Sequence, residues 1–394
     1  MVEYMENKVL KPKIRFKGFT DTWEQRKVTD VGKIFIGLVT TMTKNYTDEG
    51  TLLIRNSDIK DNHFEFNSNT IYLDECFAKL NDNRRMHIGD VVTIHTGDVG
   101  TSAVITEKED GSIGFATIVT RPNQKIIDSN YLSTYLNTEQ HKEWAINQST
   151  GDGRTNYNLK EFTQLVVPLP SLKEQQCISK YIKQIDNLIT LHQSKYDKLV
   201  NVKKALLEKM FPKDGKNVPE IRFKGFTDTW EQRKLEEIYK FQYGEFNNNP
   251  SNGGIYPVYG ANGIIGGYTN YNAENSVIIG HMGEYAGSVL WGNGKHFVTY
   301  NGTISKPRGE NVVSKFGYYM LYQKDINKIC GGSGLPFLSY EQLNKIEVCY
   351  PKDIKEQKSI VNYLTNIDNL ITLHQHKLEK LQNIKKSLLN KMFV

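Results

Sequence analysis

The sequence predicts an α+β protein that is organised as a tandem repeat of two mixed α/β blocks and two long amphipathic helices. A stretch at 171–211 recurs at 353–393 with 25 of 41 positions identical. A shorter leader at 12–27 recurs at 219–234 with 15 of 16 positions identical. The segments that separate leader from helix scarcely resemble each other. We therefore expect a repeated frame that carries two different blocks.

The repeats divide the chain into four predicted parts. These are a first block with its leader, a first long helix, a second leader with its block, and a second long helix, at residues 1–170, 171–211, 212–352 and 353–394. Apolar residues alternate in steps of four and three along both long stretches, which is typical of helices that pair through an apolar seam. Ser171 and Glu174 form a capping box, so the first helix is predicted from Leu172 to Met210. Its length would be about 58 Å.

Within the blocks, composition favours short strands, loops and a few helices. Strands are predicted at 51–56, 91–94, 277–279 and 287–291, helical segments at 130–148 and 317–327, and an extended lead-in at 165–170. Gly260, Gly263 and Gly266 lack the spacing of a dinucleotide-binding loop and are interpreted as flexible turns.

Length and composition exclude several classes of protein. The chain has 394 residues and no apolar run long enough to span a membrane. Residues 1–13 are charged and lack the apolar core of a secretory signal. Its four cysteines are scattered without a C-x-x-C pair, which argues against a metal site or a disulfide framework. We therefore expect a cytoplasmic protein.

The formal charge of +6 is unevenly distributed. Residues 28–170 carry −6 and residues 235–352 carry zero, whereas the helical regions 171–211 and 353–394 carry +4 and +3. This pattern is unlike that of a protein that coats nucleic acid without regard to sequence.

No catalytic motif is apparent. The sequence has no Walker nucleotide-binding motif and no adjacent prolines, so the N/D-P-P-Y/F motif of amino-methyltransferases is absent. His192 and His374 occupy matching seam positions, where a polar residue that sets helix register is the simplest interpretation. Lys203 and Lys385 also match, and they are expected to extend from the seam into solvent.

The candidate functional residues are polar and basic groups on loops. Arginine can hydrogen-bond guanine, and asparagine can hydrogen-bond adenine, in the major groove of DNA. In the first block the candidates are Arg55, Asn56, Thr96, Arg154, Thr155 and Asn156. In the second block they are Asn262, His281, Asn301, Lys306, Arg308 and Ser333. The group at 153–156 is favoured, because a glycine-rich loop recurs before the second long helix; any one of these residues alone is also typical of a solvated surface.

The frame resembles a known family. Each half opens with a Trp-Glu leader, at Trp23 and Trp230, and its block ends in P-L-P-S-L-K-E-Q at 168–175 or Y-P-K-D-I-K-E-Q at 350–357. This combination resembles the specificity subunit of type I restriction–modification enzymes over essentially the whole chain.

The resemblance implies that each block is a target-recognition domain that reads one half of a split, asymmetric site in double-stranded DNA. It implies that the long helices pair as an antiparallel coiled coil, fix the gap between half-sites and dock two modification subunits. The chain itself would be non-catalytic and bind no cofactor. S-adenosylmethionine would belong to the modification subunits, and ATP and Mg²⁺ to the restriction subunits.

Two further expectations follow from the duplication. If the halves are related by a pseudo-twofold axis, residues 12–27 should pack near the end of the second helix, as residues 219–234 should pack near the end of the first. The duplicated helix is also compatible with an alternative, a two-headed scaffold whose blocks bind proteins rather than DNA.

Overall fold

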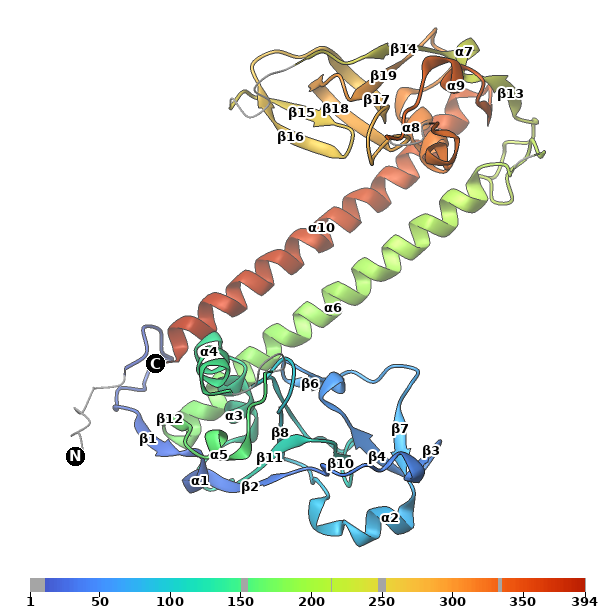
Figure 1. Ribbon diagram of the computed structural model, residues 1–394. Coiled ribbons are helices and arrows are strands. Elements are labelled where there is room, and N and C mark those ends of the chain that lie inside the picture. Colours follow the sequence, from blue (N-terminus) through green and yellow to red (C-terminus); the bar gives the residue numbers. More distant parts are fainter. Residues whose placement is uncertain (1–10, 150–154, 214, 247–252, 332–334, 394) are drawn as a thin grey trace. The chain divides into compact units, whose positions relative to one another are not determined.

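The computed structural model describes residues 11–149, 155–213, 215–246, 253–331 and 335–393 (Figure 1). Its contacts divide into two compact units, Met1–His192 with Lys377–Val394 and Gln193–His376. The division passes through both long helices, so each unit contains one α/β block and part of each helix. The four-part division predicted from the sequence follows repeat boundaries rather than spatial contacts, so it stays a prediction.

The two long helices are α6 (Leu172–Met210) and α10 (Ile354–Met392), each of 39 residues. The predicted bounds of α6 are confirmed. Ser171 caps the helix as predicted, because the backbone N–H of Glu174 donates to Ser171 Oγ over 3.4 Å. The Glu174 carboxylate binds Arg15, and its predicted return contact to the Ser171 N–H is not among the hydrogen bonds of the described residues.

Unit 1 begins with the leader and holds the first block. Its remaining elements, in chain order, are β1 (Glu24–Lys27), α1 (Val28–Val31), β2 (Gly32–Ile36), η1 (Thr43–Asn45), β3 (Tyr46–Thr47), β4 (Thr51–Ile54), η2 (Asn56–Asp58), β5 (Ile59–Lys60), β6 (His63–Phe64), β7 (Ile71–Leu73), α2 (Glu75–Leu80), η3 (Asp82–Arg84), β8 (Val91–Ile94), β9 (Ser102–Val104), β10 (Ile113–Gly114), β11 (Thr117–Pro122), α3 (Ser129–Leu136), α4 (Glu139–Gln148), α5 (Leu159–Phe162) and β12 (Val166–Leu169).

Unit 2 holds the second leader and block. Its elements are β13 (Glu231–Lys234), α7 (Leu235–Ile238), β14 (Tyr239–Tyr243), β15 (Tyr256–Gly260), β16 (Gly263–Tyr268), β17 (Ala273–Gly280), β18 (Val289–Val298), β19 (Gly302–Pro307), α8 (Ser314–Tyr322), η4 (Ile326–Ile329), α9 (Tyr340–Asn344) and β20 (Glu347–Tyr350).

Each of the two unlike blocks contains its own sheet, and four strands follow the same order in both. In unit 1 the order β2-β11-β8-β9 is antiparallel throughout. In unit 2 the order β14-β19-β17-β18 has the same sense, and the pair β15-β16 extends it. Unit 1 instead inserts a second sheet, β10-β4-β7-β3, and the short pair β5-β6. The sequence difference therefore conceals a common framework.

The predicted α+β class is confirmed, but two local interpretations were wrong. Gly260 and Gly266 lie in β15 and β16, and Gly263, with a φ of 126°, begins β16 at the turn. The predicted helical segment 130–148 is two helices, because Thr138 caps α4 by accepting a hydrogen bond from the His141 N–H over 3.2 Å.

In each unit α6 and α10 run antiparallel. In unit 1, Ile178 and Ile182 share a core cluster with Leu389 and Met392. The lysines expected to reach into solvent instead form ion pairs between the helices. Lys385 Nζ lies 2.6 Å from Asp186 Oδ1 in unit 1, and Lys203 Nζ lies 2.7 Å from Asp368 Oδ1 in unit 2. Both lysines are mostly buried, so a carboxylate partner is favoured over an extended conformation in solvent.

The repeated Glu-Gln pair at the start of each long helix connects three elements. Glu174, 1% exposed, receives two hydrogen bonds from the Arg15 guanidinium of the leader, at 2.6 and 2.8 Å. Gln175 Oε1 accepts from the backbone N–H of Asp128, next to α3, over 2.9 Å. Its amide donates to the carbonyl of Pro170, over 2.9 Å. Helix, leader and block are thereby fixed to one another.

Unit 2 repeats this joint. Arg222 donates to Glu356 at 2.6 and 2.8 Å, and Glu356 is again 1% exposed. Gln357 Oε1 accepts from the Val313 N–H over 2.8 Å, and its amide donates to the Pro351 carbonyl over 2.8 Å. The same pattern therefore serves two blocks of unlike sequence.

The expected packing of both leaders is confirmed. In unit 1 the Ile14 N–H donates to the Lys391 carbonyl over 3.0 Å, and Trp23 packs edge-on against Phe393. In unit 2 the Ile221 N–H donates to the Lys209 carbonyl over 2.9 Å, and the Trp230 ring packs against Phe211 in the same way. The first leader thus continues from the end of α10, as the second continues from the end of α6.

We predict that Glu356→Ala lowers the free energy of unfolding by about 3–5 kcal/mol, because it leaves the Arg222 guanidinium buried without its counter-charge. Chemical denaturation of the full chain measures the change. Lys358→Ala, an exposed change two residues away, is the control and should have little effect. Equal stability of both variants would contradict the structural role of the pair.

We also predict that a circular permutant folds and keeps its specificity. The permutant begins at Asn217 and joins Val394 to Lys11 through a short linker. The reason is that the leader and the end of α10 already lie in contact through Ile14 and Lys391. Circular dichroism and cooperative unfolding test folding; a permutant without a cooperative transition would contradict the continuity of the two segments.

Candidate nucleic-acid interface

Two loops occupy the same place in the shared sheet, after β8 and after β17. Their sequences are His-Thr-Gly-Asp at 95–98 and His-Met-Gly-Glu at 281–284. The glycines have φ angles of 102° and 84°, in the region that favours glycine. The sequence predictions included His281 but not His95. The shared His-x-Gly-acid pattern after an apolar strand was the signal that could have identified it.

Each loop is joined to the segment before a short helix, α5 or α9. In unit 1 the Tyr157 N–H donates to the His95 carbonyl over 2.8 Å, and Thr96 forms an antiparallel bridge with Asn156. The Gly97 N–H donates to the carbonyl of Thr155, over 3.4 Å.

Unit 2 has the corresponding contacts. The Leu338 N–H donates to the His281 carbonyl over 2.7 Å, and Met282 forms an antiparallel bridge with Phe337. The Gly283 N–H donates to the carbonyl of Pro336, over 2.9 Å. The structure therefore equates the pair Thr96–Asn156 with the pair Met282–Phe337.

In unit 1 the structure brings three predicted residues together around His95. Asn56 Oδ1 accepts from the His95 N–H over 3.4 Å, His95 Nδ1 lies 2.7 Å from Thr96 Oγ1, and Thr96 Oγ1 donates to Asn156 Oδ1 over 2.9 Å. Burial lowers the pKa of His95, and a hydrogen bond with Asn158 opposes this shift. The result is a chain of short polar groups at the end of β8.

Arg55 is differently placed. Its guanidinium donates to both carboxylate oxygens of Asp58 at 2.8 and 3.0 Å, and Asp58 is 2% exposed. This contact raises the pKa of Arg55. Arg55 therefore stabilises its own turn. Arg154 and Ser333 lie outside the described residues.

In unit 2, His281 and Asn301 lie together, because the His281 N–H donates to the Asn301 carbonyl over 3.0 Å. His281 Nδ1 and Asn301 Oδ1 are buried and have no hydrogen-bond partner within the part of the chain that the structure describes. Burial lowers the pKa of His281, and a hydrogen bond with the Asn301 backbone opposes this shift.

Aromatic rings support His281. The Tyr243 and His281 ring centroids are 4.4 Å apart, and Tyr340 stacks on Tyr243 at 4.1 Å. Phe337 packs edge-on against His281 at 5.8 Å. The equivalent site in unit 2 is thus aromatic where that of unit 1 is polar.

The remaining candidates of the second block are more scattered. Asn262 is exposed at the β15-β16 turn, which lies beside the loop after β17 because the Ser288 hydroxyl donates to the Ala261 carbonyl. Lys306 Nζ bonds Gln242 Oε1 over 3.2 Å, and Arg308 Nε bonds the Tyr239 carbonyl over 3.0 Å. These two basic residues lie at the far end of β19 from Asn301, so the structure does not bring them to this site.

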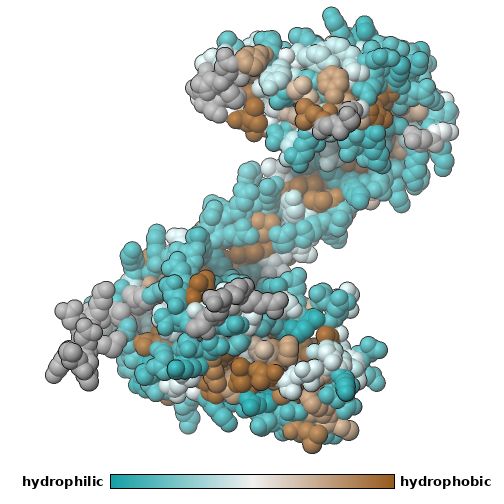
Figure 2. Space-filling view, viewed as in Figure 1, coloured by the Kyte–Doolittle hydropathy of each residue, from teal (hydrophilic) through white to brown (hydrophobic). Residues whose placement is uncertain are grey.

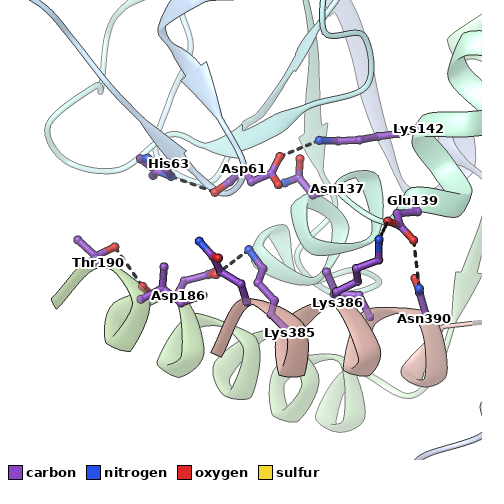
Figure 3. Close-up of a pocket in the computed structure, with 13 residues that line it drawn as sticks. Asp61, His63, Asn137, Glu139, Lys142, Asp186, Thr190, Lys385, Lys386 and Asn390 are labelled. Atoms are coloured by element: carbon purple, nitrogen blue, oxygen red, sulfur yellow. Dashed lines mark hydrogen bonds and ion pairs between the residues drawn. The ribbon is translucent and has the colours of Figure 1, made fainter. Parts of the chain in front are cut away.

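A cleft of about 540 Å³ in unit 1 lies between the block and the two helices (Figure 3). Its lysines are engaged with carboxylates: Lys142 with Asp61 at 2.8 Å, Lys385 with Asp186 at 2.6 Å, and Lys386 with Glu139 at 2.7 Å. These ion pairs connect the two helices to each other and α10 to the block, so the cleft is interpreted as a structural contact region. Within the described residues, no cluster of three or more His, Cys, Asp or Glu side chains is suited to a metal ion, and no helix is long and apolar enough to cross a membrane.

Comparisons with known proteins agree with this architecture. The family model "Type I restriction modification DNA specificity domain" matches residues 20–201 and 227–383. The type I restriction enzyme MjaVIII specificity subunit of Methanocaldococcus jannaschii is 23% identical over 353 residues, which cover 80% of each chain. The EcoBI specificity subunit of Escherichia coli is 30% identical over 144 residues, 35% of this chain and 29% of that one.

A solved structure supports the fold. The crystal structure of the type I restriction–modification S subunit from M. genitalium matches with a TM-score of 0.74 at 18% identity, over 97% of this chain and 99% of that one. Since the family model matches both halves and most of the length, this chain belongs to the type I restriction–modification DNA-specificity family, as a sequence-recognition protein rather than a catalytic subunit.

Proposed function

We propose that this chain is a specificity subunit whose two blocks each read one half of a bipartite, asymmetric site in double-stranded DNA. The observation that carries the proposal is the repeated frame with chemically different sites at equivalent strand ends. The leaders match at 15 of 16 positions and the helical stretches at 25 of 41, so this repeated frame is poorly suited to distinguish two different half-sites. The loops after β8 and β17 differ in side-chain chemistry and can do so. The alternative, a scaffold that binds proteins through its blocks, is not favoured by membership of a DNA-specificity family.

We propose that the polar groups gathered at these loops make the base contacts. In unit 1 these are Asn56, Thr96, Thr155 and Asn156, and in unit 2 they are Asn262, His281 and Asn301. Lys306 and Arg308 are exposed and suited to phosphate contacts at a distance from the loops. Such contacts, together with the basic helices, offset the absence of a net positive charge on the blocks.

The long helices are proposed to fix the gap between half-sites and to dock two modification subunits. Their exposed apolar residues support docking, because four of those on α6 have exposed apolar counterparts on α10. Tyr181, Leu188, Leu191 and Val202 on α6 correspond to Tyr363, Leu370, Leu373 and Ile384 on α10. Figure 2 shows hydrophobic side chains interrupting the hydrophilic surface of the helices. A duplicated apolar surface is suited to two copies of one partner.

The wider assignment is also part of the proposal. The chain acts in the cytoplasm, does not associate with a membrane and binds no cofactor of its own. The modification subunits supply S-adenosylmethionine for adenine methylation, and restriction subunits supply ATP-dependent, Mg²⁺-dependent cleavage.

Exchange of one block tests the two-reader model. We predict that replacing residues 28–170 with the corresponding block of another family member changes one half of the methylated motif and leaves the other unchanged. Mapping methylated adenines in DNA from cells that carry the native or hybrid chain gives the result. A simultaneous change of both halves would rule out independent readers.

Paired substitutions separate a structural residue from a DNA contact. We expect Arg55→Ala to lower the free energy of unfolding by about 3 kcal/mol, because buried Asp58 loses its counter-charge. Asn56→Ala removes one long hydrogen bond, so its cost is about 1 kcal/mol or less. In specific binding we expect Asn56→Ala to lose about 1–3 kcal/mol of discrimination at one base pair.

Denaturation and binding to the mapped site measure both quantities. If Arg55→Ala preserved stability and weakened binding at one base pair, Arg55 would be a base contact, contrary to the geometry.

A further inference from the structure

The pairs Thr96–Asn156 and Met282–Phe337 meet the requirements for a specificity determinant. They lie outside the repeated leader and helices. They occupy equivalent places, because each pair bridges a His-x-Gly loop to the segment before α5 or α9. The flanking residues keep the same backbone contacts in both units, so the two pairs are presented alike. Their chemistry nevertheless differs completely, since one pair is polar and the other apolar.

The polar pair retains hydrogen-bonding capacity. Thr96 Oγ1 donates to Asn156 Oδ1, and both side chains are partly exposed. The Nδ2 group of Asn156 carries two N–H donors of the kind that can hydrogen-bond an acceptor on a base edge. His95 Nδ1 lies 2.7 Å from Thr96 Oγ1 and so helps to position this hydroxyl.

The apolar pair presents an aromatic ring on a rigid support. Phe337 is 40% exposed although it is a large apolar residue. Its backbone is held on both sides, because it bridges to Met282 and to Gly331. The His281 ring packs edge-on against the Phe337 ring, and Tyr243 packs against His281 with a tilt of 32° between the two rings. A ring fixed in this way loses little conformational entropy when it contacts a binding partner.

We propose, on the basis of the function proposed above, that these pairs are equivalent specificity determinants with different chemistry. In unit 1, Thr96 and Asn156 read a base edge through hydrogen bonds. In unit 2, Met282 and Phe337 contact the C5-methyl group of a thymine in the major groove. Apolar side chains recognise thymine by this methyl group, whereas amide side chains pair with the polar edges of bases.

Replacing thymine with uracil tests the assignment, because it removes only the methyl group. The full chain is purified through an affinity tag with the subunits that accompany it. It selects binders from two random-sequence DNA pools, one synthesised with thymine and one with uracil. The block exchange described above shows which half of the selected motif belongs to unit 2.

We expect one position of the unit 2 half-site to require thymine, and uracil there to weaken binding about fourfold, as expected for one buried methyl group. Selection at the unit 1 half-site should be the same in both pools. Phe337→Ala should remove the difference between thymine and uracil, and Phe337→Leu should retain part of it.

Exchange of the pairs adds a second arm. Met282→Thr with Phe337→Asn should change the base selected at that one position and leave the unit 1 half-site intact. Ile255→Ala, a strongly exposed apolar change elsewhere in unit 2, is the matched control and should leave the motif unchanged.

The outcomes separate the inference from the proposed function. If the native chain selects no bipartite motif, the proposed function fails and the inference with it. If it selects a motif whose unit 2 half is equally strong in both pools, the methyl contact is refuted while the function stands. The uracil comparison uses the native chain, so it remains decisive even where a variant does not fold. An effect of Phe337→Ala that is equal in the two pools would mark the ring as a wedge between bases and also overturn the methyl contact.

Discussion

The buried Glu-Arg pair at the start of each long helix is the contact on which the rest of the structure depends. Glu174 and Glu356 are both 1% exposed and each receives two hydrogen bonds from an arginine of the leader. Taking both charges out of water is costly, so such a pair stabilises the fold little relative to an apolar contact of the same shape. Its effect is to fix the position of the leader relative to the helix, because separating the pair would leave a buried charge without its partner. The adjacent glutamine extends the joint to the block, so leader, helix and block take one arrangement in both units.

This joint explains how one frame can carry two unlike blocks. The glutamine of this joint contacts each block through a backbone group, the N–H of Asp128 in unit 1 and that of Val313 in unit 2. A block can therefore change its sequence as long as it presents the same backbone at this point. The shared sheet then carries the loops after β8 and β17 to equivalent places. Variation is left to the strand ends and to the insertions, where it does not disturb the core.

The candidate site shows the same division between support and variation. Burial lowers the pKa of both His95 and His281, and Gly97 and Gly283, two residues after them, permit the same turn. The residue between the histidine and the glycine differs in the two loops, as does its bridge partner. Thr96 pairs with Asn156 in unit 1, and Met282 pairs with Phe337 in unit 2. A constant backbone with variable side chains allows the bases that are read to change without a change in how the loop is presented. Arg55 illustrates the opposite case, since its ion pair with Asp58 commits it to the fold.

The sequence by itself determined the duplication, the bounds of the first long helix and the α+β class, because these follow from local repeats, capping residues and periodicity. The Trp-Glu leaders and the Lys-Glu-Gln starts of the long helices carried the resemblance to the family. It could not determine the common sheet, since strand order depends on contacts between distant segments and the two blocks share few residues. It missed the ion pairs of Lys203 and Lys385, because the partner carboxylate lies on the other helix, about 165 to 199 residues away along the chain. It also could not show that Thr96 and Asn156 are neighbours while Lys306 and Arg308 lie apart from Asn301. Only the tertiary structure decides this, because proximity at a strand end follows from sheet register and not from position in the sequence.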